Sequence, residues 1–455
     1  MGVTTKHPQY SENEGKWQKC RDAFDGSEAV KARGETYLPK LGGQNSDDYD
    51  AYTDRALYYN ATARTIQGWL GCVFRKDPQI AVPETIQQQL QDVTLTGIPI
   101  EALAKTALQE VLTVGRYGIL VDMPTEDSSE RRPYLIPFKA EQIVNWQTAR
   151  RQGDVVLSMV VLRESEAEPQ PEDPFEIKNV EQYRVLTLEG DTLNTYTVRV
   201  WRQIDKNDPD SWSPVAECVP KLKGQPLDFV PFCFIGPNTI LPDVEKSPSE
   251  DLVDVNLSHY RSSADLEHGR HYTALPTVWV AGFPTEGTEL RIGSQTAWIT
   301  DRTDAKAGIL EFTGQGLGAL EKALSQKEAM MAALGARLLE DPKRAAEAAE
   351  AIRLRLGGEQ VALTTIANTA GLALTIVLQW FADWAGVSGD VTVRLNTEFF
   401  EQTMDPAMLR ELVTVWQGGA IAKATLYHNM ERSGLTRPGV DFEQEQAEVQ
   451  AGTVL

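Results

Sequence analysis

The sequence is poor in the residues on which most thiol and metal sites depend. It has four cysteines, which lie far apart and form no C-x-x-C pair: Cys20, Cys72, Cys218 and Cys233. This scatter favours buried, reduced thiols over disulfides or a metal cluster. The amino-terminal residues also lack the apolar segment of a signal peptide, so we expect a protein of the cytosol.

Positive charge is in deficit as well. The 455 residues include 65 acidic and 44 basic side chains, which gives a formal net charge of −21. Free nucleic-acid-binding proteins are usually basic, because phosphate contacts supply most of their affinity. The charge therefore excludes a protein that holds DNA tightly along its whole surface. The length predicts two or more domains, and the hydrophobic content of 42% is ordinary for a globular chain.

Motifs of common enzymes are missing or incomplete. The sequence contains neither G-x-x-x-x-G-K-[ST] nor G-x-S-x-G. The segment Gly314–Ala319 matches G-x-G-x-x-A between a predicted strand and a predicted helix, so a nucleotide-binding enzyme is one alternative. A dinucleotide site also needs a second parallel strand that ends in an acidic residue, and this sequence predicts helices there. We therefore interpret the segment as a glycine-rich turn and predict no cofactor and no enzyme.

Histidine is scarce, and three of the five histidines fall in one predicted helix: His259, His268 and His271. The spacing of His268 and His271 permits a shared metal ion, with Asp265 and Glu267 as the local candidates for further ligands. The interpretation we favour is a polar helix surface that packs beside copies of itself, without a metal.

A long uncharged segment, Gln360–Ala382, could be mistaken for a membrane span. Its residues separate into two stripes. Polar or small residues recur at heptad-like steps, and a second stripe is apolar. A membrane-associated assembly protein is therefore an alternative, and a two-faced helix buried between domains or subunits fits better.

The most unusual feature is the order of elements between Ser249 and Glu340. Helical periodicity predicts one helix from about 251 to 272 and another from about 319 to 339. The segment between them, residues 275–314, is rich in Thr, Val, Ile, Trp, Gly and Pro, which favours strands and turns. Two helices that flank a small β insert are an odd arrangement for the core of an enzyme.

The rest of the chain predicts a mixed α+β body. Strands are expected at 115–123, 134–138, 155–162, 182–187, 194–202 and 229–235, as an antiparallel meander. Residues 164–174 are expected to form a solvated acidic loop. Helices are expected at 51–74, at 343–356 with a break at Gly357-Gly358, at 407–416 and at 423–432, and the acidic tail from Asp441 is expected to fray.

This order of elements resembles the portal protein, or head–tail connector, of tailed double-stranded DNA bacteriophages, of the variety known only as a domain of unknown function. Local segments support the resemblance, which covers most of the chain with diffuse motifs. They are Tyr58–Arg64, Phe74–Pro78, Gly115–Gly118, Ala140–Trp146 and Asp251–Tyr272.

The resemblance implies a portal-like division of the chain. Residues 1–248 would be the wing, 249–272 and 315–340 the two stem helices, and 273–314 the β-rich clip. Residues 341–398 would hold the tunnel region and a wing helix, and 399–455 a short helical crown. The resemblance also implies a homo-oligomeric ring, commonly a dodecamer, at one vertex of the capsid, assembled in the host cytoplasm.

Such a ring would be a channel for genome packaging and ejection. Its implied partners are double-stranded DNA, the terminase, the major capsid or scaffold protein and a tail adaptor, with no membrane. Four basic residues in an otherwise acidic chain are the candidates for DNA contact: Lys343, Arg344, Arg353 and Arg355. The alternative is that they form salt bridges with Glu347, Glu350 and Glu359.

Overall fold

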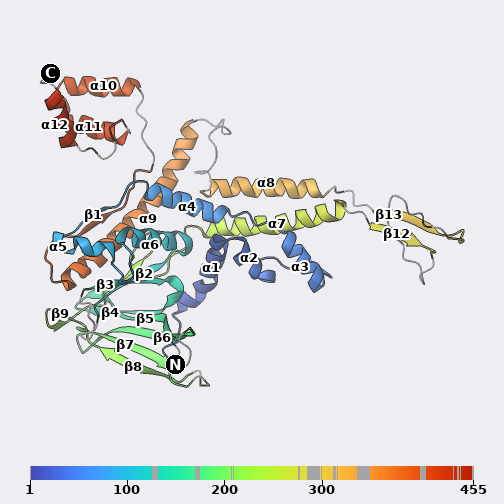
Figure 1. Cartoon of the computed structure of the whole chain (residues 1–455), viewed down its shortest axis with the longest axis horizontal. Helices are drawn as coiled ribbons and strands as arrows, with labels where there is room; N and C mark the ends of the chain where they lie inside the picture. Colours follow the sequence, from blue (N-terminus) through green and yellow to red (C-terminus); the bar gives the residue numbers. More distant parts are fainter. Residues whose placement is uncertain are drawn as a thin grey trace.

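The chain is described from a computed structural model. The structure describes residues 2–124, 132–169, 175–205, 207–208, 210–274, 277–283, 298, 300–310, 314, 316–335, 349–399, 406–433, 435–437, 440 and 442–452. Within the helix that begins at residue 349, the side chains up to residue 361 are not placed. Figure 1 shows a mixed body of helices and sheets, a long arm that extends from it, and a set of carboxyl-terminal helices. The fold is α+β, as the sequence predicted.

The amino-terminal part is helical and packs into the body. Its elements are α1 (Pro8–Asp25), α2 (Ser27–Ala32), a 3-10 turn (Gly34–Thr36), α3 (Ser46–Arg55) and α4 (Ala61–Val73). The single helix expected at 51–74 is wrong, because α3 ends at Arg55 and α4 starts afresh. The Asn60 side chain caps α4 by accepting a hydrogen bond from the Ala63 amide at 2.9 Å. The buried Tyr58 hydroxyl, between the two helices, donates to the Ala23 carbonyl at 2.8 Å.

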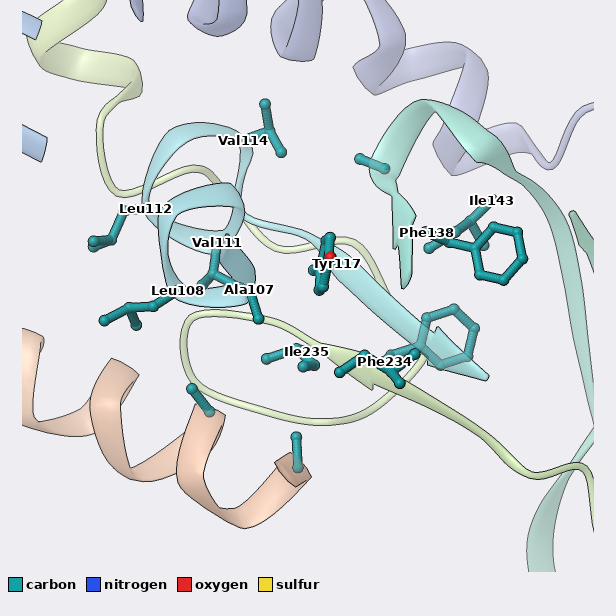
Figure 2. Close-up of a cluster of buried hydrophobic side chains, with 14 of the residues drawn as sticks. Ala107, Leu108, Val111, Leu112, Val114, Tyr117, Phe138, Ile143, Phe234 and Ile235 are labelled. Atoms are coloured by element: carbon teal, nitrogen blue, oxygen red, sulfur yellow. The ribbon is translucent and has the colours of Figure 1, made fainter. Parts of the chain in front are cut away.

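A three-stranded sheet and one helix form the centre of the core. The sheet has the order β11 (Phe232–Ile235), β2 (Tyr117–Asp122) and β3 (Tyr134–Lys139), all antiparallel. Before it come α5 (Glu84–Gln87), a 3-10 turn (Gln88–Gln91) and α6 (Ile100–Val114). Figure 2 shows Ala107 and Val111 of α6 on the side of Tyr117 of β2 and Ile235 of β11, and all four side chains are buried. Gly118 has no room for a Cβ, because Phe232 and Ile143 occupy that space.

A second sheet follows the chain in simple order, as in a meander. The single meander that the sequence predicted is wrong in its extent, because β2, β3 and β11 form the separate central sheet. Its strands are β4 (Ile143–Arg151), β5 (Asp154–Pro169), β6 (Ile177–Glu189), β7 (Thr195–Gln203) and β8 (Trp212–Cys218). The sequence did not predict β4, β8 or the small hairpin of β9 (Lys221–Leu222) and β10 (Gln225–Pro226).

The acidic loop expected from residue 164 is wrong for its first half. Residues 164–169 extend β5 and pair with β6. Their charges are neutralised across the strands: Arg184 Nε donates to Glu164 at 2.8 Å, and Arg202 Nη1 donates to Glu168 at 2.7 Å. Cross-strand pairs of opposite charge stabilise a sheet, so the acidic residues belong to a strand here. The second half, residues 170–174, lies outside the described residues.

The longest helix, α9 (Ala349–Trp384), runs through the body without interruption. The break expected at Gly357-Gly358 is therefore wrong. A glycine inside a helix costs only about 0.5–1 kcal/mol relative to alanine, and it ends a helix only where a left-handed cap competes. The packing of the following turns outweighs this cost, since Ala367, Leu374 and Phe381 are completely buried.

The polar stripe of this helix has a partner within the same chain. β14 (Thr392–Arg394) pairs with β1 (Gln79–Ala81) and lies against α9. The Thr375 hydroxyl accepts a hydrogen bond from the Val393 amide at 2.9 Å, and Gln379 Oε1 accepts one from the Val391 amide at 3.1 Å. The polar stripe of α9 therefore forms hydrogen bonds with the backbone at β14. Hydrogen bonds of this kind are expected of a helix packed inside a protein body and are not evidence for a membrane span. α9 is nevertheless the one described helix that is long and apolar enough to span a bilayer.

Three helices end the described chain: α10 (Pro406–Gln417), α11 (Lys423–Arg432) and α12 (Phe442–Gly452). The first two match the predicted helices closely. The fraying expected from Asp441 is wrong, because residues 442–452 are helical. The Phe442 ring lies 5.5 Å from the Tyr427 ring of α11, and Arg437 pairs with Glu445 at 2.7 Å. These contacts give α12 the packing that its acidic sequence alone does not suggest.

Candidate functional site

The arm consists of two antiparallel helices and a hairpin. Helix α7 (Glu250–Ala274) runs outward, and α8 (Leu317–Ala333) returns beside it (Figure 1). Between them, β12 (Thr277–Ala281) pairs with β13 (Lys306–Leu310) at the far end. The predicted order of helix, β insert and helix is confirmed. The intervening residues 284–297 lie outside the described part of the chain.

The start of α7 is fixed to the end of α6. The hydroxyls of Ser247 and Ser249 both donate to the Thr113 carbonyl, at 2.8 and 3.0 Å. Gly115 ends α6 with a φ of +80° and lies so close to Ser247 that a Cβ would be 3.0 Å from the Ser247 Cα. The glycine therefore serves both as a helix cap and as a close contact with the base of the arm.

Asn256 joins α7 to the connection between α3 and α4. It is completely buried. Its Oδ1 accepts hydrogen bonds from the Thr62 hydroxyl at 2.9 Å and from the Thr62 amide at 3.2 Å, and its Nδ2 donates to the Tyr59 carbonyl at 2.7 Å. The Tyr58 hydroxyl also lies 3.2 Å from Asn256 Oδ1. Because one side chain contacts four backbone or hydroxyl groups, it holds the base of the arm in place.

Two further contacts reach the middle of α7. Arg261 Nε donates to the Tyr37 carbonyl at 2.8 Å, and the Tyr52 hydroxyl donates to Asp265 Oδ1 at 2.6 Å. Burial and the neighbouring Asp265 carboxylate raise the pKa of Tyr52. Beyond Leu266 no α7 side chain is buried. The body therefore supports the inner part of α7, and among the described residues its last ring contact along the helix is that of Tyr52 with His268.

The two arm helices are joined by polar contacts more than by a core. Lys327 Nζ donates to the Ser258 carbonyl at 2.9 Å and to the Ser262 hydroxyl at 2.6 Å. Farther out, Arg270 pairs with Glu321 at 2.9 Å. The helices approach closely at Gly269, where a Cβ would lie 2.6 Å from Leu317 Cδ2. Such contacts set the register of the pair but contribute little energy where they are exposed.

His259 lies in this seam. It is buried, and its Nε2 is 3.5 Å from a carboxylate oxygen of Glu328 on α8. Burial lowers the pKa of His259, and the Glu328 carboxylate opposes that shift in part. The neutral imidazole is therefore the favoured form at neutral pH.

The inner end of α8 contacts the body at a small apolar cluster. Met331 packs with Leu252 of α7 and Ala61 of α4. Gly335, with a φ of +118°, follows the helix and comes so close to Trp69 that a Cβ would lie 2.5 Å from the ring. Among the described residues of α8, only Met331 and Ala332 are buried.

Large apolar side chains remain exposed along the arm. On α8 and at its end, Met330 is 53% exposed and Leu334 is 38% exposed. On the hairpin, Trp279 is 45% exposed and Ile309 is 58% exposed. These four side chains are candidates for contact with another chain, since they lie on one projecting element.

The predicted DNA contacts are not placed by this structure. Lys343 and Arg344 lie outside the described residues. Arg353 and Arg355 fall within the backbone of α9, in the part whose side chains are not placed. These four residues therefore stay a prediction from sequence.

The alternative sites find little support in the geometry. The strand before the glycine turn, β13, pairs antiparallel with β12 in a two-stranded sheet, whereas a dinucleotide site is built on parallel strands. His268 packs edge-on to the rings of Tyr52 and Tyr272, at 5.1 and 4.7 Å between centroids. Among the residues that the structure describes, no group of three or more His, Cys, Asp or Glu side chains is arranged to hold a metal ion.

Sequence reasoning missed the residues that fix the arm to the body. Asn256 and Thr62 are separated by almost 200 positions, and Lys327 bonds to α7 through groups that carry no motif. A polar residue on the apolar side of a predicted helix, as Asn256 is, was the available signal.

The family model that matches the chain is DUF4055, a domain of unknown function, over residues 248–385. This segment contains α7, the hairpin, α8 and α9. A comparison with curated proteins gives no match.

Among solved structures, the chain is similar to a protein in the virion of a native gene transfer agent (GTA) particle. The identity is 12%, the TM-score is 0.40, and the match covers 91% of this chain and 99% of that one. A chain in the neck of the empty GTA particle, computed with C6 symmetry, is similar at 13% identity and a TM-score of 0.39, over 87% of this chain and 95% of that one.

Proposed function

We propose that this chain is the subunit of a phage portal, a homo-oligomeric ring at one vertex of the capsid. In this proposal α7 and α8 are the stem, the β12–β13 hairpin belongs to the clip, and the helices α10–α12 belong to the crown. The ring, commonly a dodecamer, conducts double-stranded DNA during packaging and ejection. It acts as a channel and a docking site and not as an enzyme.

The arm is the observation that carries the proposal. The two arm helices meet through polar contacts and leave Met330, Leu334, Trp279 and Ile309 exposed to solvent. A single arm therefore leaves apolar surface in water. Copies of the arm that stand side by side would cover these side chains. The same packing would place the hairpins together at one end of the assembly, where a terminase or a tail adaptor could dock.

The charge of the chain supports a channel for DNA more than a DNA clamp. A conduit must let DNA move in both directions, and a strongly attractive lining would slow it. A subunit with a net charge of −21 satisfies this condition. In this proposal the body of the subunit faces the major capsid or scaffold protein. The ring assembles in the host cytoplasm and remains in the virion.

The oligomeric state of the purified chain tests the proposal directly. We expect closed rings in negative-stain micrographs and a mass that is a multiple of the subunit mass. Replacing Met330 and Leu334 together by Glu should convert rings into single subunits, because charges would then face the neighbouring arm. The matched control replaces Val155 and Val215 by Glu, two exposed side chains of the five-stranded sheet, and should still form rings.

Single subunits of the unmodified protein at every concentration, with no rings in micrographs, would refute the proposal. Loss of rings in the Val155 and Val215 control alone would instead place the contact between subunits on the sheet.

Arg353 and Arg355 remain the proposed points of DNA contact beside the tunnel. Replacing both with Ala should reduce genome packaging and leave ring assembly intact, because a cation that touches phosphate contributes to holding DNA and not to the fold. Packaged DNA per particle, measured by quantitative PCR, checks this. Normal packaging would return the two residues to salt bridges with the neighbouring glutamates.

A further inference from the structure

A small cavity lies at the carboxyl end of α9, beside the β9–β10 hairpin (lower left in Figure 1). Its volume is about 130 Å³. A cavity of roughly 150 Å³ in a protein interior accommodates benzene, so this one has room for a group of a few heavy atoms. The lining is mainly aromatic and aliphatic, with one carboxylate: Leu222, Leu227, Phe229, Pro231, Trp380, Trp384 and Asp383.

The aromatic residues that line the cavity are held in place by a hydrogen bond and by a ring contact. Trp384 is buried, and its Nε1 donates to the Lys221 carbonyl at 3.2 Å. The ring of Trp380 lies 5.2 Å from the ring of Phe229. Trp380 and Phe229 are only half-buried.

The carboxylate stands where a negative charge is least favourable. Asp383 belongs to the last turn of a 36-residue helix, which has no basic residue in that turn. The carbonyl groups at a helix carboxyl end carry partial negative charge, so an anion there is repelled and a cation is attracted. Gln379 Nε2 donates to Asp383 Oδ1 at 3.2 Å, and Asp383 forms no ion pair with any residue that the structure describes.

We propose that this cavity binds an alkylammonium group, the group that ends a lysine side chain and many small amines. Trp380, Trp384 and Phe229 line the cavity, and an aromatic ring attracts a cation that lies over its face through its quadrupole. The Asp383 carboxylate and the helix end supply the opposite charge, and the aliphatic walls contact the methylene groups. An anion would be repelled, and a neutral group of the same size would gain only apolar contact. The site is independent of the proposed ring.

Calorimetric titration of the full-length protein with n-butylammonium chloride tests the site, with 1-butanol as the neutral ligand of similar size. We expect n-butylammonium to bind and 1-butanol to bind at least tenfold more weakly. Asp383→Asn keeps the shape of the side chain and removes its charge, and it should weaken n-butylammonium binding on the order of tenfold. Trp380→Leu should weaken it several-fold, because it removes one aromatic face.

The control variant is Asp390→Asn, which removes the same charge from an exposed position outside the cavity lining and should leave the affinity unchanged. Far-ultraviolet circular dichroism confirms that each variant is folded. Equal affinity for 1-butanol and n-butylammonium would overturn the proposal, and so would unchanged binding in Asp383→Asn.

A second titration with Nα-acetyl-lysine N-methylamide distinguishes the two sources of the group. Binding of this compound as tightly as n-butylammonium indicates a lysine side chain from another protein chain. Binding of n-butylammonium alone indicates a small free amine.

Discussion

Helices α8 and α9 follow each other in the sequence but differ in how many of their apolar side chains the subunit buries. α9 lies within the body, where Ala367, Leu374 and Phe381 are completely buried and its polar stripe bonds to β14. α8 lies on α7 and leaves Met330 and Leu334 exposed. The described side chains of α9 therefore make most of their contacts within the subunit, whereas α8 leaves large apolar side chains exposed.

The difference separates folding from assembly. Residues of α9 contribute to the free energy of unfolding of a single subunit, since each buried side chain adds apolar contact. The exposed residues Met330 and Leu334 contribute little to that free energy. Any effect of replacing them would therefore be expected on assembly with a neighbouring chain. A variant that weakens one property and spares the other tests this separation.

The largest expected effect is on the α9 side of the comparison. Phe381→Ala should lower the free energy of unfolding by about 3–5 kcal/mol, because it leaves a cavity in a closely packed core. Met330→Ala, the matched change on α8, should alter it by less than about 0.5 kcal/mol. Urea denaturation followed by circular dichroism checks both, at concentrations where the mass shows single subunits. Similar shifts in the two variants would remove the distinction between the helices.

A second test addresses the joint between arm and body. Asn256→Ala leaves the Thr62 amide, the Thr62 hydroxyl and the Tyr59 carbonyl without their partner. Each buried polar group without a partner costs about 1–3 kcal/mol, and water that enters the space left by the side chain reduces this cost. We therefore expect the free energy of unfolding to fall by about 3 kcal/mol. Hydrogen exchange measured by mass spectrometry should become faster in residues 250–266 and stay unchanged in α9.

The control for this change is Asn429→Ala on α11, whose Nδ2 bonds only to the Thr425 carbonyl one turn away in an exposed position. It should have almost no effect on exchange. If α7 exchanges at the original rate in Asn256→Ala, the serine contacts with Thr113 hold the arm without help from Asn256.

The same contrast explains which features the sequence could predict. The arm was predictable because helical periodicity and strand composition are local properties. The meander was predicted in part: β5, β6 and β7 pair with their neighbours in the chain, whereas β2, β3 and β11 form a separate sheet whose order the sequence did not predict. The uninterrupted helix at Gly357-Gly358 was not, because the packing that outweighs two glycines comes from distant elements. The strand at residues 164–169 was not, because its charges are neutralised by Arg184 and Arg202 on other strands.

The candidate sites follow the same rule. Asn256 needs Thr62, and the cavity at Asp383 needs the β9–β10 hairpin, which the sequence did not predict. Helix α12 was missed because its acidic composition resembles that of a solvated tail. Its contact with Tyr427 is visible only in three dimensions.

The smallest expected effect concerns the charge of Asp383 at the carboxyl end of α9. Asp383→Asn removes a negative charge from the negative end of the helix while an oxygen remains to accept the hydrogen bond from Gln379. In the absence of any amine, it should therefore raise the free energy of unfolding by about 0.5 kcal/mol. Thermal unfolding at low ionic strength measures this, and the gain should shrink as salt is added, because salt screens the charge.

Asp390→Asn is the reference, and it should leave the unfolding temperature unchanged, since Asp390 lies beyond the end of the helix. A clear loss of stability in Asp383→Asn would mean that the carboxylate supports the helix end through Gln379. A gain in stability together with weaker n-butylammonium binding would mean that the subunit retains an unfavourable charge for the sake of a ligand. The end of α9 would then resemble the exposed side of α8, as a surface whose residues are explained by a partner and not by the fold.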